Sequence, residues 1–201
     1  MRTSEIASLP VVTLAGDDVA QIKDLVFSAD GGAVSGFTLA GRGLLAGPLK
    51  EGLSWPKVVG LGPDAVMIAD ESSLDPRDDV VAAAASTTEG VGSGGNVLGD
   101  RLLTDSGTDL GKVVDVVIEF GSGDAGQCDV VGYEIEASEA LTAASSKGGK
   151  GTRLLVPLPD TISVSSEHVM VPASAKDFVT QDLAGFGASV QQFRDQLKGP
   201  A

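Results

Sequence analysis

Residues 121–126, GSGDAG, have the G-x-G-x-x-G pattern of loops that bind dinucleotide phosphates. Such a loop leads into a helix whose N-terminus meets the pyrophosphate. Here the next residues are QCDVVGYEIE, which alternate between apolar and polar as a strand does. We therefore predict a hairpin, in which Gly121, Gly123 and Gly126 permit positive φ, and we expect no bound cofactor.

The chain has one histidine and one cysteine, which limits the chemistry available to it. Any mechanism that needs imidazole must use His168, which we place at the start of a strand, partly exposed. Cys128 has no neighbouring histidine or basic residue to lower its pKa, so a nucleophilic role is not expected. One cysteine can form neither an intramolecular disulfide nor a zinc cluster. We therefore predict no catalytic residue and no metal site.

Two acids, Asp24 and Asp115, lie at matching places in two similar predicted strands. A pair of carboxylates can do acid and base work if both reach one substrate. These two belong to different parts of the chain, and nothing in the sequence brings them together. We interpret each as an acceptor of hydrogen bonds from a neighbouring loop or strand edge.

The net charge is −14, and acidic residues are spread evenly along the chain. This balance excludes the broad basic face on which nonspecific nucleic-acid binding depends, so no direct nucleic-acid partner is expected. A local basic cluster in residues 145–153 holds Lys147, Lys150 and Arg153. It departs from the phosphate-loop pattern, so a solvated loop is the first interpretation and a weak anion or partner contact the alternative.

The elements that would position these residues occur twice, as an internal sequence repeat. Residues 6–27 align without a gap on residues 97–118, and both copies read as strand, Gly/Asp turn and strand. Further strands match in residues 34–41 and 130–137. We interpret the shared polar and glycine positions as structural; they are Gly16, Asp18, Asp24, Gly107, Asp109 and Asp115.

The chain is predicted to be mainly β, with two tandem small barrels of about five strands each. The first barrel would occupy residues 1–73, and the second residues 96–174. Residues 74–95 are predicted to form a short helix and a Gly-rich linker, and residues 175–201 a C-terminal amphipathic helix. Trp55 is expected to anchor the core of the first barrel.

The phrases DLGKVVDVVIE and SWPKVVGLGPDAVMI, and the spacing between them, resemble the PRC-barrel family. That family includes the cytoplasmic part of the photosynthetic reaction-centre H subunit and a ribosome maturation factor. The resemblance covers most of residues 6–72 and 96–173, so it implies tandem barrels. It also implies docking surfaces and carries over no active site. No membrane helix like that of the reaction-centre subunit is expected.

Two apolar groups are candidates for partner contact. The Gly-rich loop 41–52 holds leucines that suggest a lid or contact patch, with coverage of a barrel end as the plainer account. The tail has one apolar stripe at helical spacing, which fits docking on a barrel, self-association or binding in a partner's groove. These candidate contacts are Leu44, Leu45, Leu49, Leu183, Phe186, Val190, Phe193 and Leu197.

The sequence favours a non-enzymatic adaptor or scaffold that contacts another protein or a copy of itself. One alternative is a ribosome or RNA assembly factor that binds a basic protein, by analogy of fold alone. Another is a small-ligand module with a site between the barrels or in the Gly-rich loop 41–52. The N-terminus lacks the apolar core of a signal peptide, and no apolar run could span a membrane, so a cytoplasmic protein is expected. The acidic, Gly/Ala/Val-rich composition points to a prokaryotic source.

Overall fold

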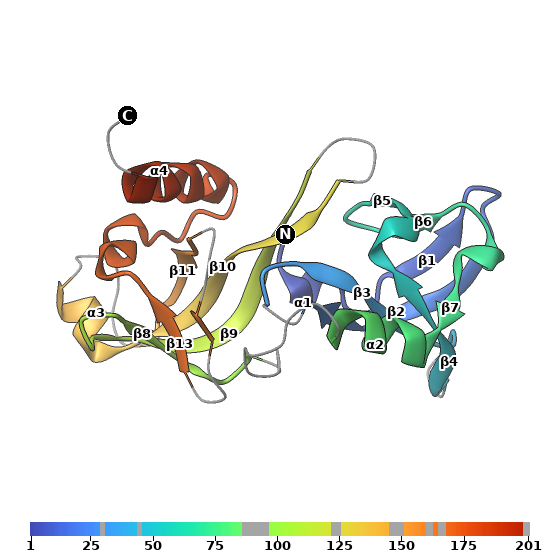
Figure 1. Ribbon diagram of the computed structural model, residues 1–201, viewed down its shortest axis with the longest axis horizontal. Coiled ribbons are helices and arrows are strands. Elements are labelled where there is room, and N and C mark those ends of the chain that lie inside the picture. The colour runs from blue at the N-terminus through green and yellow to red at the C-terminus, as the bar shows by residue number, and fades with distance from the viewer. Residues whose placement is uncertain are drawn as a thin grey trace.

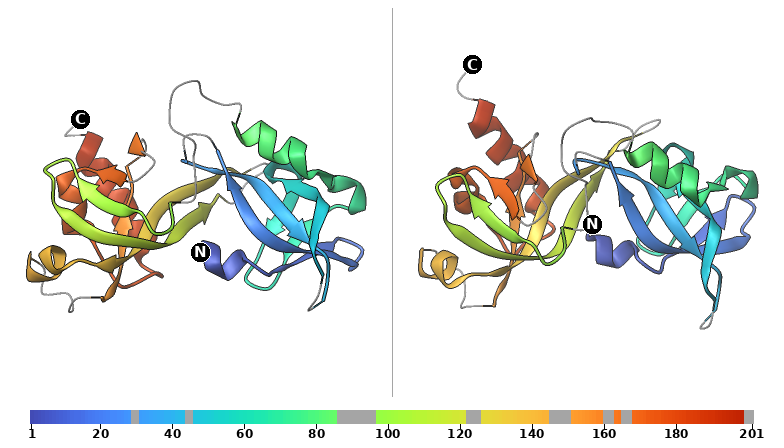
Figure 2. Two further views of the ribbon diagram at one scale, coloured as in Figure 1. Left: turned by 90° about the horizontal axis from the view of Figure 1, so that it is seen from below. Right: turned by 60° about the horizontal axis from the view of Figure 1, so that its bottom comes forward.

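The computed structural model describes residues 1–28, 31–43, 46–85, 97–121, 126–144, 151–159, 163–164 and 168–198. Two strongly curved β-sheets lie side by side along the long axis of the molecule, and the N-terminus lies between them (Figures 1 and 2). The mainly β prediction with two small barrel-like units is therefore confirmed.

The first sheet has the strand order β5-β6-β1-β2-β3-β4-β7. All its neighbouring strands are antiparallel except β1 and β6, which are parallel. Its strands are β1 (Pro10–Thr13), β2 (Asp18–Phe27), β3 (Val34–Ala40), β4 (Pro48–Ser54), β5 (Val58–Leu61), β6 (Val66–Ile68) and β7 (Asp75–Pro76).

The second sheet has the order β11-β10-β9-β8-β13-β12, with β8 and β13 parallel. Read from the other end, this is the order β5-β6-β1-β2-β3-β4 of the first sheet. Each sheet thus has six equivalent strands, one more than the five expected. The strands are β8 (Arg101–Thr104), β9 (Asp109–Phe120), β10 (Cys128–Ala137), β11 (Arg153–Pro157), β12 (Ser163–Val164) and β13 (His168–Val171).

The first turn of each sheet has the same hydrogen bonds. In the turn after β1, Gly16 N donates to Thr13 O (2.9 Å), and in the turn after β8, Gly107 N donates to Thr104 O (2.8 Å). Both glycines have positive φ, 94° and 80°, which side chains with a Cβ rarely adopt. Gly16 and Gly107 therefore have the same structural role in the two sheets.

The helices are short and lie around the sheets (Figure 1). None of those in the described part of the chain is long and apolar enough to cross a membrane. The α-helices are α1 (Thr3–Ile6), α2 (Arg77–Ala85), α3 (Glu139–Ala144) and α4 (Phe186–Lys198). The 3₁₀ turns are η1 (Trp55–Lys57), η2 (Glu71–Ser73) and η3 (Ala173–Phe178).

Helix α2 packs on the first sheet at a glycine of β3. Val80 of α2 is buried, and a Cβ on Gly36 would lie 2.8 Å from Val80 Cγ1 and 2.5 Å from Leu53 O. Only a glycine at position 36 lets the helix approach the strands this closely. The predicted helix between the repeats is present, and it covers strands β3 and β4.

Helix α4 packs on the second sheet at the equivalent glycine of β10. Phe186 is buried, and a Cβ on Gly132 would lie 2.6 Å from Phe186 Cε1 and 2.6 Å from Val156 O. Val190 packs in the same cluster with Leu155. The helix begins at Phe186, later than residue 175, because residues 173–178 form the 3₁₀ turn η3.

The tail stripe therefore docks on its own sheet, which was one of three open alternatives. Phe186, Val190 and Phe193 are buried within the chain, so they are not a free surface for a partner. Leu183 is partly buried against the same cluster, whereas Leu197 is exposed. The helix docks because its apolar stripe packs on an apolar outer face formed by β9, β10 and β11. The sequence does not reveal that face, because its residues come from three separate strands.

The prediction for the loop of residues 121–126 can be tested at its two ends. GSGDAG joins β9 to the antiparallel strand β10, so the hairpin is confirmed at its described ends. Gly121 and Gly126 do not adopt the positive φ that glycine permits. Gly126 is needed because a Cβ there would collide with Gly121 O across the hairpin. Gly123 lies outside the described residues.

We predict that Gly132→Ala lowers the free energy of unfolding by about 1–3 kcal/mol, because the added methyl group overlaps Phe186 and Val156. Gly60→Ala in β5 is the matched control, since its Cβ would lie 3.8 Å from the nearest atom, Met67 Cβ. Urea denaturation of both variants checks this, and equal stability of the two would contradict the packing.

Candidate functional site

The N-terminal segment adds a short strand to the edge of β9. Met1 N donates to Ile118 O (2.9 Å), and Ile118 N donates to Met1 O (2.9 Å). Arg2 forms an antiparallel bridge with Val117 one residue further on. The first residues of the first barrel thus belong, by hydrogen bonding, to the second sheet.

The opposite edge of the same hairpin is held by the loop before β3. Val130 N in β10 donates to Gly32 O (2.9 Å), and Ala33 forms an antiparallel bridge with Asp129. The outer half of the β9–β10 hairpin, residues 113–120 and 126–131, therefore lies between two segments of the first barrel. We call this arrangement the hairpin clamp.

Asp115 fixes helix α1 to the second sheet. Its carboxylate accepts hydrogen bonds from Thr3 Oγ1 (2.7 Å), Ser4 N (3.2 Å) and Ser4 Oγ. It also accepts one from its own neighbour, Val116 N (2.8 Å). Asp115 is only 5% exposed, and its lone pairs are used, as a buried carboxylate requires. A strand residue thus caps a helix that is more than a hundred residues away in sequence.

Asp24, the counterpart of Asp115, has no such role. Its side chain is 67% exposed and lies 3.8 Å from Lys23 Nζ. Strand β9 has the same register shift at Val113 and Asp115, so the shift does not separate the two acids; Asp115 is buried because residues of α1 bond to it. The structure does not bring the two acids together, and they are 5% and 67% exposed in different sheets.

The remaining repeat-shared acids also differ in their contacts. Asp18 is exposed and lies 3.7 Å from Arg42. Asp109 lies 3.6 Å from Arg101 and accepts a hydrogen bond from Gly111 N (2.9 Å). Both sit at the start of the second strand of their sheets, where they close turns and contribute little charge-pair stability.

A charged pair completes the clamp beside α1. Arg2 Nε donates to Glu134 Oε2 of β10 (2.6 Å), and Arg2 Nη1 donates to Glu5 Oε1 (3.3 Å). The Glu134 carboxylate raises the pKa of Arg2 above its ordinary value, chiefly through this hydrogen bond. Glu134 is mostly buried, so loss of Arg2 would leave a poorly solvated carboxylate behind.

Trp55 lies where the two barrels meet. Its ring contacts Phe37 of its own barrel (centroids 6.0 Å apart) and Phe120 of β9 edge-on (5.5 Å). Its indole Nε1 donates to Gly126 O across the junction (2.7 Å). Trp55 is buried in the core beside Phe37, as expected, and from the 3₁₀ turn η1 it also contacts the second barrel.

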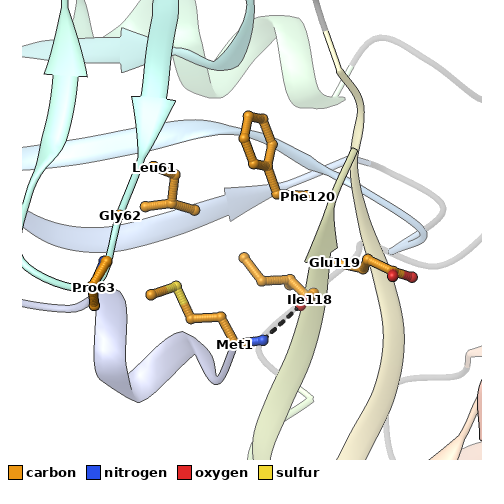
Figure 3. Close-up of a pocket in the computed structure, with 7 residues that line it drawn as sticks. All are labelled: Met1, Leu61, Gly62, Pro63, Ile118, Glu119 and Phe120. Carbon is orange, nitrogen blue, oxygen red and sulfur yellow. Dashed lines mark hydrogen bonds between the residues drawn. The ribbon is translucent and has the colours of Figure 1, made fainter. Parts of the chain in front are cut away.

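An apolar pocket of about 300 Å³ opens at this junction (Figure 3). One wall is Leu61, Gly62 and Pro63, at the end of β5, and the other is the end of β9 with Met1. Figure 3 shows the side chains of Leu61, Met1, Ile118 and Phe120 around the space, while that of Glu119 points away from it. We call this the junction pocket.

The remaining candidate residues are scattered over the molecule. Leu49 lies in strand β4 and packs partly buried against the core, so it belongs to the sheet and not to a lid. His168 is half-buried at the start of β13, as expected. Arg153 begins β11 and is exposed. Leu44, Leu45, Lys147 and Lys150 lie outside the described residues.

Sequence reasoning missed the residues that matter most at the junction. Arg2, Thr3 and Ser4 read as an unremarkable N-terminus, and Phe120 as the last residue of a strand. Each of these residues contacts a residue of the other barrel, so no local periodicity in the sequence marks it. The only signal was Asp115, an acid in a run of valines, because a buried carboxylate requires donors from elsewhere.

We predict that Asp115→Asn lowers the free energy of unfolding by about 1–3 kcal/mol, because a buried hydrogen-bond network loses its charged acceptor. The matched variant Asp24→Asn should change it by less than about 0.5 kcal/mol, since that side chain is exposed. Denaturation followed by the fluorescence of Trp55, the single tryptophan, checks both. Equal effects would contradict the role of Asp115.

We also predict that the thiol of Cys128 is inert in the folded protein. Cys128 is fully buried, and burial, with a smaller contribution from Asp129, raises its pKa to about 12. The reactive thiolate is therefore scarce at about pH 8 and appears only as the pH nears that value. A disulfide reagent should react promptly only after unfolding in guanidinium, and rapid stoichiometric reaction of the native protein would contradict this.

The comparisons agree with the fold. The family model described as the PRC-barrel domain matches residues 1–74. This range ends at Leu74, just after strand β6 and the turn η2 that follows it. No curated protein matches the chain. The match covers 74 of the 201 residues, and that part of the chain is similar to the PRC-barrel domain.

Proposed function

We propose that the protein is a non-enzymatic scaffold that binds a protein partner through the outer faces of its two sheets. The observation that carries this proposal is an outward-facing apolar pair at the same place in both sheets. In the first sheet the pair is Val12 and Met67, which are register partners in the parallel strands β1 and β6. In the second it is Leu103 and Met170 of β8 and β13.

These side chains alternate with buried neighbours, so they point away from the core. Val12 and Met67 are half-buried between fully buried residues of the same strands. Met170 is 36% exposed, and Leu103 is half-buried beside it. Methionine adapts its shape to different apolar partners, which suits a binding surface. We call these four residues the outer pairs.

The second sheet is proposed to be a second PRC barrel. Its support is the strand order that it shares with the first sheet and the glycines under α2 and α4. Two equivalent faces held at a fixed separation by the hairpin clamp can engage a repeated or dimeric partner with avidity. A cytoplasmic location belongs to the same proposal, and the single, buried Cys128 supports it.

We predict that Met67→Lys and Met170→Lys together abolish partner capture, and that either alone weakens it. Each lysine places a charge in an apolar contact and so disrupts that face. A single variant keeps one intact face and loses only the avidity of two. Affinity capture from the source cells compares these variants with the wild type, with partners identified by mass spectrometry. Val81→Lys, on α2 at a residue 45% exposed, is the control that should leave capture unchanged. An identical set of captured proteins in all variants would refute the proposal.

A further inference from the structure

The end of strand β9 is an open sheet edge. Gly121 N donates to Gln127 O, which makes Phe120 and Cys128 a pair whose backbone groups point away from each other. Ile118, two residues earlier, directs its N–H and C=O to Met1. Phe120 therefore directs its N–H and C=O to the same outer side as Ile118.

The Phe120 backbone is free on that side. In the described part of the chain, it makes no hydrogen bond outside the β9–β10 ladder. Its side chain is 38% exposed, although it contacts the ring of Trp55. An N–H and a C=O at an open edge are the groups to which an added strand binds.

The junction pocket lies beside this open edge. Leu61 and Pro63 face Ile118 and Phe120 across a space of about 300 Å³ (Figure 3). That volume is at the lower end of small-molecule sites and accommodates one large side chain. An edge that offers backbone hydrogen bonds, next to a pocket for one side chain, has the two components by which extended peptides are recognised.

We propose that an extended segment of a partner protein adds to β9 at Phe120 and inserts one large apolar side chain into the junction pocket. The inference rests on the proposed function, because it requires a protein partner. Its main support is continuity with an existing interface, since Met1 and Arg2 already occupy the preceding part of this edge in the same way.

The charge of the protein favours a basic segment. The net charge is −14, and the charged groups at the pocket are the Glu119 carboxylate and the Met1 ammonium, which donates to Ile118 O. Lysine or arginine residues flanking the apolar anchor would be attracted by this field, whereas an acidic segment would be repelled. The expected ligand is therefore an extended peptide with one large apolar residue between basic residues.

The experiment begins with a phage-displayed library of random linear heptapeptides, selected on the full-length protein. Enriched peptides are synthesised, and their dissociation constants are measured by fluorescence anisotropy. We expect an apolar residue with basic neighbours in the enriched peptides. Leu61→Glu should weaken binding by about tenfold or more, whereas Val59→Glu, in the same strand and outside the pocket, should change it by less than about twofold.

Hydrogen exchange of the wild-type protein separates strand addition from simple pocket binding. The bound peptide should slow exchange of the Phe120 amide by about tenfold or more. Failure to enrich any peptide, binding unaffected by Leu61→Glu, or an unchanged Phe120 amide would each overturn the inference. None of these results touches the outer pairs, so loss of capture in the Met67/Met170 variant would still support the scaffold proposal.

Discussion

The hairpin clamp is the constraint on which the rest of the structure depends. The β9–β10 hairpin is too long for its own sheet, because β8 pairs only with residues 109–112 of β9 and β11 only with residues 132–136 of β10. Without partners, the outer half would expose two strand edges with unpaired backbone groups. Each hydrogen bond formed at such an edge contributes about 0.5–1.5 kcal/mol. Residues 1–2 and 32–33 of the first barrel pair with parts of those edges, at Val117 and Ile118 and at Asp129 and Val130, so this pairing also orients the two barrels.

A second constraint explains why both barrels keep a helix against them. Gly36 and Gly132 each leave a gap on the outer face of their sheet, and Val80 and Phe186 fill the gaps. A sheet strand with a glycine in its interior is weakened unless something packs there. The helices α2 and α4 are therefore parts of their barrels. The outer pairs lie on other strands of the same outer faces and stay partly exposed, as do residues such as Leu14 and Val59.

The sequence predicts whatever depends on short-range pattern. Alternation marks the strands, and Gly16 and Gly107 mark the turns, because positive φ is a local requirement. The docking of Phe186 and the bridging role of Trp55 depend on surfaces assembled from distant residues, so composition and spacing are silent about them. Asp24 and Asp115 show the limit most clearly. They align without a gap and lie at the same register shift in β2 and β9, but α1 covers only the second.

The open edge at Phe120 poses a risk that the charge of the chain reduces. An exposed strand edge beside an apolar pocket invites pairing with the same edge of another copy. Two copies that each carry a net charge of −14 repel one another as they approach, and the repulsion acts before short-range hydrogen bonds can form. A basic peptide meets the opposite field and is drawn to the same edge. Beyond keeping the protein in solution, the acidic composition thus favours pairing of β9 with a basic peptide over pairing with another copy of the chain.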